Sequence, residues 1–179
     1  AVAASGDGRF MVAYAVNLPG ASSPFSVVFN LVEYNGGPQV GPPSVIDTGT
    51  SREGTAVAWM PHAQQFMVMW SKFGPPRNTK VLYSMAVTRD GGPAQIHQVT
   101  DNVDFIDMAT AQIAQGADNN LMVIGWRDSS NATMAPNGGI SYTQVSESGA
   151  PIMNTGNIVG PSSTWYRYQR VAYNAQTQK

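Results

Sequence analysis

The 179-residue sequence contains no cysteine, few charged residues and no long apolar run. The absence of cysteine excludes disulfide bonds, thiolate metal sites and cysteine nucleophiles. Charged side chains are only 12% of the residues and leave a formal net charge of −1, so the basic stripe that nucleic acids or anionic membrane surfaces attract is missing. No stretch approaches the roughly 18 consecutive apolar residues of a membrane helix. The sequence therefore predicts neither a nucleic-acid partner nor a membrane span.

Helical periodicity is lacking too, and in its place the sequence repeats about every 55 residues. The segments VAASGDGRFMVAY from Val2, VAWMPHAQQFMVMW from Val57 and IAQGADNNLMVIGW from Ile113 each contain a short apolar strand, a turn and a second strand. Each second strand ends on an aromatic residue, and these equivalent residues are expected to pack as core between repeats: Tyr14, Trp70 and Trp126.

A second marker repeats with the same period. Downstream of each hairpin, an alternating strand leads into a turn, which reads EYNGGP from Glu33, TRDGGP from Thr88 and SESGAP from Ser146. Glycine and Asn or Asp supply the positive φ that tight turns require. Each unit therefore reads as four short strands joined by turns and one longer loop.

Four short strands per unit are typical of a β-propeller blade. The sequence predicts an all-β chain, a β-propeller fragment with three four-stranded blades over residues 1–54, 55–109 and 110–169. Residues 170–179 are expected to form the first strand of a fourth blade. A β-sandwich or a solenoid of hairpins is the alternative, but neither has a reason to repeat with this period.

Propellers typically close a ring with roughly four to eight blades. Three blades and a strand would leave two blade faces open, and open apolar faces favour association. The expected partner is a second chain that carries the remaining blades, or a copy of this same chain; an incompletely observed longer chain is the third possibility. The turn that ends at Lys179 also fits cleavage by a trypsin-like protease, which would make the chain a proteolytic fragment.

The units VAASGDGRFMVAY, VAWMPHAQQFMVMW and RVAYNAQTQK resemble the repeats of secreted bacterial β-propeller proteins. In those repeats, a similar hairpin precedes a strand that ends in a Gly-Gly-Pro-like turn. The resemblance covers the whole chain and consists of packing and turn residues, although methionine replaces the usual aliphatic residues at Met11, Met67, Met69 and Met122. It implies a propeller fold and a secreted or cell-surface location, and it supplies no catalytic motif.

Aromatic residues near the channel or outside the repeat are the candidate ligand-binding residues. Trp165, Tyr166, Arg167 and Tyr168 form a run that breaks the repeat, and Trp59 lies on a first strand, close to the expected central channel. Flat aromatic rings match pyranose rings and arginine supplies hydrogen-bond donors, so this set suits a glycan or a peptide. The alternative is an aromatic link that packs over the next blade.

Asp101, Asp104 and Asp107 form the densest carboxylate cluster and are the candidate metal ligands. Ca²⁺ prefers several carboxylate and carbonyl oxygens. The spacing is not that of an EF-hand, however, and the pattern favours turn or link roles for these residues over a metal site. His62 and His97 have no metal-ligand neighbour at a useful spacing. No other cofactor is expected.

Two functions remain open from the sequence. Regular repeats without a catalytic motif favour an exported binding or structural module, which takes a glycan or a protein at a loop face. The alternative is a propeller hydrolase or lyase, because two carboxylates that face each other across a central pocket can hydrolyse a glycosidic bond. Whether the protein is an enzyme is left undecided by these patterns.

Overall fold

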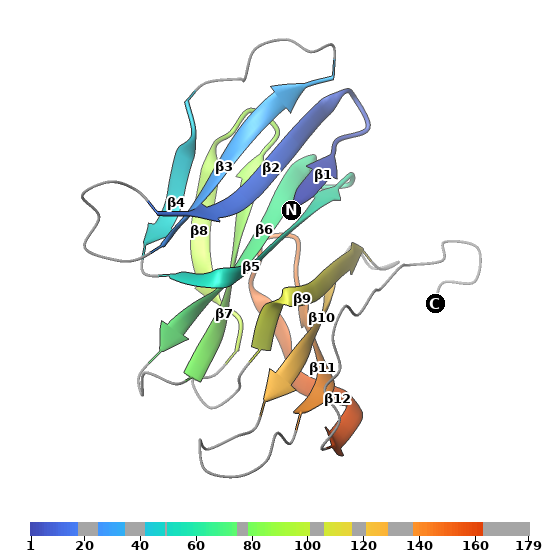
Figure 1. The fold of residues 1–179 in the computed structure, drawn as a ribbon. Helices are drawn as coiled ribbons and strands as arrows, with labels where there is room; N and C mark the ends of the chain where they lie inside the picture. The colour runs from blue at the N-terminus through green and yellow to red at the C-terminus, as the bar shows by residue number, and fades with distance from the viewer. Residues whose placement is uncertain are drawn as a thin grey trace.

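The computed structural model describes residues 1–17, 25–34, 42–48, 50–74, 79–100, 106–115, 121–128 and 138–162. Side chains are described for residues 1–17, 25–34, 42–48, 55–72, 81–100 and 142–152. Over the described backbone the chain forms three four-stranded antiparallel sheets, and no helix long and apolar enough to cross a membrane occurs there (Figure 1). The predicted first strand of a fourth blade, residues 170–179, lies outside this part.

Within each sheet, the strands pair in the order in which the chain forms them. The first sheet contains β1 (Val2–Ala4), β2 (Arg9–Val16), β3 (Ser26–Glu33) and β4 (Ser44–Thr48). The second contains β5 (Thr50–Met60), β6 (Gln65–Gly74), β7 (Thr79–Thr88) and β8 (Pro93–Gln98). The third contains β9 (Ile106–Gln115), β10 (Leu121–Asp128), β11 (Gly138–Val145) and β12 (Pro151–Ser162). This is the predicted blade pattern, and the all-β fold class is confirmed.

The second sheet is covered on both faces at β6, which explains the unbroken apolar run FMVMW in that strand. Side chains alternate across a strand, so Phe66, Val68 and Trp70 pack against the first sheet, while Met67 and Met69 pack on the other side. All five are 0% exposed. A strand covered on both faces needs such a continuous run, whereas a half-exposed strand would alternate with polar residues.

Two apolar layers hold the three sheets together. The layer between the first and second sheets unites β2 and β3 with β6 and β7, and its buried members are Met11, Ala13, Val27, Phe29, Leu31, Phe66, Val68, Trp70, Met85 and Val87. The layer on the other side of the second sheet includes Met67, Met69 and Leu82 together with Val145 of the third sheet. The sheets are therefore stacked face to face in chain order.

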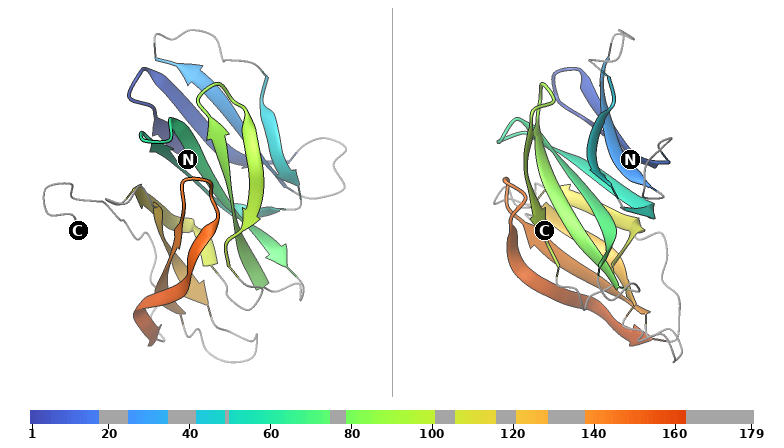
Figure 2. Two further views of the ribbon diagram at one scale, coloured as in Figure 1. Left: turned by 180° about the vertical axis from the view of Figure 1, so that it is seen from behind. Right: turned by 90° about the vertical axis from the view of Figure 1, so that its left-hand side faces the viewer.

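The first strands of the sheets lie next to one another. β5 contacts β9, and β1 and β2 both contact β5. The stacked sheets diverge from this line of inner strands, and β4, β8 and β12 form their outer edges (Figure 2). Inner strands gathered at one side and outer strands spread apart are the arrangement of adjacent propeller blades.

The short turns among the described residues lie at one end of the sheets, because antiparallel neighbours place the turns after the first and third strands together. We call this end the turn face; it comprises residues 5–8, 33–34, 61–64, 88–92 and 146–150. Gly8, Gly91 and Gly149 each adopt a φ near +90° in these turns, a conformation that glycine adopts at little cost.

Candidate binding site

A hollow of about 320 Å³ opens on the turn face where the first and second sheets meet. It is lined by Asp7, Gly8, Arg9, Glu33, Tyr34 and Arg89. The first sheet supplies five of these residues from its two turns and the strand ends beside them, and the second sheet supplies Arg89 from the β7–β8 turn. The hollow therefore exists only because the two sheets are stacked.

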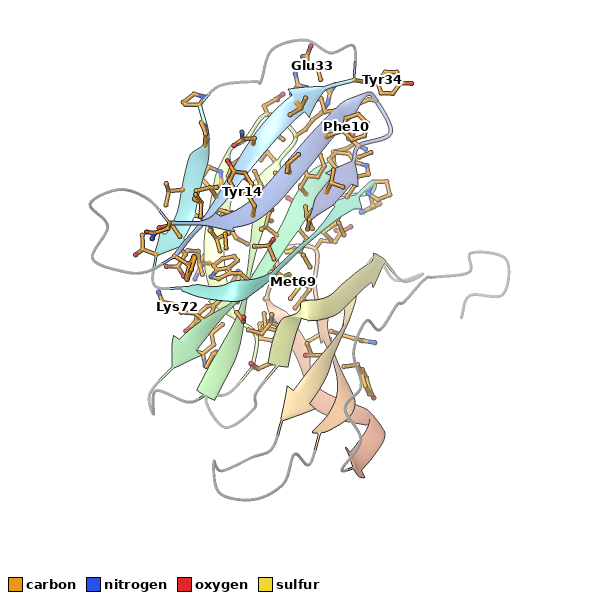
Figure 3. The ribbon with its side chains drawn as sticks, in the orientation of Figure 1. Phe10, Tyr14, Glu33, Tyr34, Met69 and Lys72 are labelled. Carbon is orange, nitrogen blue, oxygen red and sulfur yellow. The ribbon has the colours of Figure 1, made fainter. Side chains whose placement is uncertain are left out.

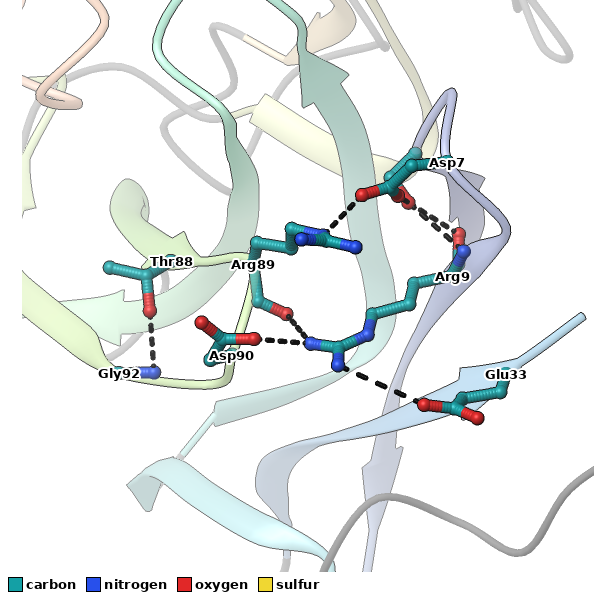
Figure 4. A network of polar contacts seen from close by, with 8 residues as sticks. Asp7, Arg9, Glu33, Thr88, Arg89, Asp90 and Gly92 are labelled. Atoms are coloured by element: carbon teal, nitrogen blue, oxygen red, sulfur yellow. Dashed lines mark hydrogen bonds and ion pairs between the residues drawn. The ribbon is translucent and has the colours of Figure 1, made fainter.

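Arg9, at the start of β2, reaches across to the second sheet (Figure 4). Its Nη1 donates a hydrogen bond to the carbonyl oxygen of Arg89 at 3.1 Å and another to the carboxylate of Asp90. Its Nη2 lies 3.8 Å from Oε1 of Glu33 in its own sheet. One guanidinium therefore holds together two turns of different sheets.

Arg89 makes the reciprocal contact, because its Nε forms an ion pair with the carboxylate of Asp7. The Ser5 hydroxyl donates a hydrogen bond to the same carboxylate. This hydrogen bond is the main reason that the pKa of Asp7 lies below its ordinary value, and the positive charges of Arg89 and Arg9 lower that pKa further. Asp7 is therefore ionised over the whole neutral range and keeps Arg89 in place.

The lowered pKa gives the Asp7 contact a defined pH dependence. A carboxylate whose folded-state pKa is depressed stabilises the fold above its unfolded-state pKa, and the stabilisation is lost as the pH falls through the folded-state pKa. In an NMR titration, we expect the pKa of Asp7 to rise in the variant Ser5→Ala and to rise less in Arg89→Gln, because the hydrogen bond has the larger effect. A larger rise in Arg89→Gln would show that this ranking is wrong.

Tyr34 is the aromatic residue among those that line the hollow. Its side chain is 77% exposed, and its ring stacks on Phe10 with centroids 6.0 Å apart and planes inclined by 22°. Its backbone N–H donates a hydrogen bond to the carbonyl oxygen of Gly8 at 2.6 Å. The backbone hydrogen bond and the contact with Phe10 hold the residue in one position, while most of the side chain is exposed to solvent.

The second and third sheets repeat these turn contacts with different charges. The Gln65 side chain donates to the carbonyl oxygen of Glu147, just as Arg9 donates to that of Arg89. Nδ1 of His62 lies 2.8 Å from Oε1 of Glu147, in the place of the ion pair between Asp7 and Arg89. The hydrogen bond from a side chain to a turn carbonyl oxygen is therefore repeated at both junctions between sheets. The charged residues around it differ between the two junctions.

This equivalence predicts how the junction responds to substitution of Arg9. The variant Arg9→Ala should lose about 1 kcal/mol of unfolding free energy, the usual net value of one such hydrogen bond with a partly exposed ion pair. The variant Arg9→Gln should lose less, because Gln65 already makes the equivalent contact in this fold. Urea denaturation of the two variants measures both values, and equal losses would contradict the equivalence.

The residues singled out in the sequence are only partly within the described structure. Trp165, Tyr166, Arg167 and Tyr168 lie outside the described residues, as do Asp101 and Asp104. Asp107 lies in β9, opposite Trp126 of β10 in the strand register, and its side chain is not described. Among the side chains that are described, no group of three His, Asp or Glu residues is arranged to hold a metal ion. The proposed Ca²⁺ ligands stay a prediction.

Trp59 lies on β5 as expected, but its ring contributes to packing. It is half-buried against the layer between the first and second sheets, with its centroid 4.7 Å from that of Phe66. Its binding role stays a prediction. Sequence reasoning missed Tyr34, Arg9 and Arg89 as a group, because it assigned the turns to structure alone. The available signal was Tyr34, an aromatic residue where the equivalent turn positions carry Arg89 and Glu147.

Comparison with known proteins supports the fold. No protein-family model and no curated protein sequence matches the chain. The solved structures include a match to xylan β-1,4-xylosidase from Bacillus halodurans C-125, with a TM-score of 0.52 and 11% sequence identity over 90% of this chain. That enzyme has a β-propeller-type fold, and the match spans 31% of its length. The chain is thus an all-β protein of the β-propeller type, and this similarity concerns the fold alone.

Proposed function

We propose that this protein is an exported β-propeller recognition module that binds a glycan or protein ligand at a loop face, and that the turn-face hollow is a glycan site. The observation that carries the proposal is that the largely exposed Tyr34 lines this hollow together with two arginines and the carboxylates of Asp7 and Glu33. The resemblance to secreted bacterial propeller repeats supports export, and the ring would be completed by another chain or copy.

The composition of the hollow suits a sugar. An aromatic face stacks on the C–H face of a pyranose ring, while guanidinium groups donate to hydroxyl oxygens and carboxylates accept from hydroxyl groups. Arg9 and Arg89 are already paired with acidic groups, so the hollow has little net charge to attract a strongly ionic ligand. A neutral polyhydroxylated ligand uses both donors and acceptors.

Xylo-oligosaccharides are the first probe to test. The structurally similar enzyme is named for xylan β-1,4-xylosidase activity, and a shared fold makes its substrate a reasonable starting ligand. A panel that also contains other neutral β-linked oligosaccharides guards against too narrow a choice. Product analysis in the same experiment tests the alternative function, because shortened oligosaccharides would identify a hydrolase.

Calorimetric titration of the variant Tyr34→Ala tests the role of the ring. We expect about a tenfold weaker affinity for the bound oligosaccharide, which corresponds to about 1.4 kcal/mol of lost stacking. The matched control Tyr34→Phe keeps the ring and should bind within about twofold of the unmodified protein. Failure of the whole panel to bind, or equal binding by Tyr34→Ala, would refute a glycan site in the hollow.

A further inference from the structure

The two arginines of the turn-face hollow differ in how fully their guanidinium groups are paired (Figure 4). In Arg9, Nη1 contacts the carbonyl oxygen of Arg89 and the carboxylate of Asp90, and Nη2 lies near Glu33. Arg89 uses Nε alone, in its ion pair with Asp7. Among the residues that the structure describes, no hydrogen bond or ion pair involves Nη1 or Nη2 of Arg89. Arg89 is therefore the arginine that retains donors for a ligand.

The position of the Arg89 guanidinium is fixed by its other contacts. Its Nε is buried against Asp7, which also accepts a hydrogen bond from the Ser5 hydroxyl. Its backbone carbonyl oxygen accepts from Arg9. The Arg89 side chain as a whole is nevertheless 43% exposed, so its solvent contact lies on atoms other than Nε. Because a guanidinium is planar, a held Nε leaves Nη1 and Nη2 as a pair of donors in one defined plane.

Glu33 supplies an acceptor from the other side of Arg9. Its carboxylate is 42% exposed, and the 3.8 Å that separates it from Nη2 of Arg9 is longer than a hydrogen bond. Figure 3 shows Glu33 and Tyr34 together at the end of β3, with Phe10 next to Tyr34. The hollow therefore combines a donor pair from the second sheet with an acceptor and an aromatic ring from the first.

The charges around the hollow decide which group the donor pair of Arg89 suits. A guanidinium edge fits either the two oxygens of a carboxylate or two hydroxyl oxygens on adjacent carbons. Asp7, Glu33 and Asp90 already place three carboxylates around two guanidinium groups. A further carboxylate would be repelled by these groups and would compete with Asp7 for Arg89. Adjacent hydroxyl groups avoid this repulsion, because they accept from Arg89 and donate to Glu33.

We propose that Nη1 and Nη2 of Arg89 bind two hydroxyl groups on adjacent carbons of a neutral pyranoside whose ring lies against Tyr34, while Glu33 accepts a hydrogen bond from one of them. Equatorial hydroxyl groups leave the C–H face of the sugar flat for contact with the aromatic ring. The ligand class is thus a neutral pyranoside with neighbouring equatorial hydroxyl groups. This inference rests on the proposed glycan site and adds the part of the sugar that is recognised.

Methyl β-D-xylopyranoside and its 2-deoxy, 3-deoxy and 4-deoxy derivatives test this recognition by NMR titration of the unmodified protein. The C3 hydroxyl belongs to both possible adjacent pairs, so the 3-deoxy sugar should bind about tenfold more weakly, the usual effect of one hydrogen bond to a charged group. One of the other two derivatives should lose a similar factor, and the remaining one should bind within about twofold of the parent sugar. Equal affinities for all four sugars, or no binding of the parent xyloside, would overturn the proposal.

The variant Arg89→Lys assigns the recognition to the guanidinium. Lysine keeps the positive charge beside Asp7 but lacks the planar pair of donors. This variant should bind the parent xyloside and its 3-deoxy derivative within about twofold of each other. The matched control Glu147→Gln changes the equivalent turn position at the next junction and should retain the full discrimination. Discrimination that survives Arg89→Lys would also overturn the proposal.

The failure of this inference and the failure of the glycan site give different results. Binding that Tyr34→Ala weakens, but that shows no preference for the C3 hydroxyl, would remove the role of Arg89 and leave the glycan site in place. No binding by any glycan would remove both. Methyl β-D-glucuronide should bind no more tightly than methyl β-D-glucopyranoside, and tighter binding would show that Arg89 takes a carboxylate instead.

Discussion

The variant Trp70→Ala should lose about 3–5 kcal/mol of unfolding free energy, the usual cost of removing a large buried aromatic side chain. Trp70 is 0% exposed and stacks on Tyr83, with ring centroids 6.0 Å apart. Its Nε1 donates to Oδ2 of Asp47 in the first sheet at 3.0 Å. Truncation would open a cavity between the sheets and remove this donor. Urea denaturation measures the loss.

The variant Trp70→Phe separates packing from hydrogen bonding. Phenylalanine retains much of the apolar volume and lacks the donor, so the loss should be about 1–2 kcal/mol. Asp47 would still contact Nζ of Lys72, which lies 2.9 Å from its Oδ1. If Trp70→Ala cost no more than Trp70→Phe, the indole would not fill the layer between the sheets as described.

The variant Gly149→Ala should have the second largest effect on stability. Gly149 has a φ of +89°, and a Cβ added there would lie 3.0 Å from Oγ of Ser84. The left-handed backbone alone costs a non-glycine residue about 1–2 kcal/mol. Ser84 is buried and donates its hydroxyl to the carbonyl oxygen of Gly149, so it has little room to move aside. Thermal and urea unfolding should both show the loss.

Gly6 offers the matched control on the same turn face. An added Cβ there meets nothing within 4 Å, and Gly6 has no positive φ. The variant Gly6→Ala should therefore change the unfolding free energy by less than about 0.5 kcal/mol. Equal effects at the two glycines would contradict the close approach of the third sheet to Ser84.

Much of the fold could be predicted because the repeat encodes it. Hairpin and turn markers with one period correctly predicted three four-stranded sheets in chain order. Trp70 packs between sheets, as its place in the repeat predicted. Tyr14, its equivalent, is only half-buried, because nothing covers its face to the extent that the first sheet covers Trp70. Periodicity predicts which side a residue faces, but the neighbouring sheet determines whether that side is buried.

The candidate site was less predictable, because its contacts join distant parts of the chain. Arg9 and Arg89 are separated by 80 residues, and the sequence does not show which turns of different sheets will meet. The proposed role of Tyr34 depends on this meeting, since Arg89 lines the same hollow only when the two turns meet. Side-chain contacts between sheets depend on how the sheets stack. The repeat predicts that the sheets are neighbours, but it does not predict which side chains meet.

An NMR titration with xylo-oligosaccharides and the wider glycan panel tests most directly whether the turn-face hollow binds a sugar. Backbone amide shifts locate the bound ligand without any substitution. If the hollow is the site, the largest shifts will fall on Gly8, Arg9, Tyr34 and Arg89. Shifts confined to the inner strands β5 and β9, or no shifts with any glycan, would contradict it.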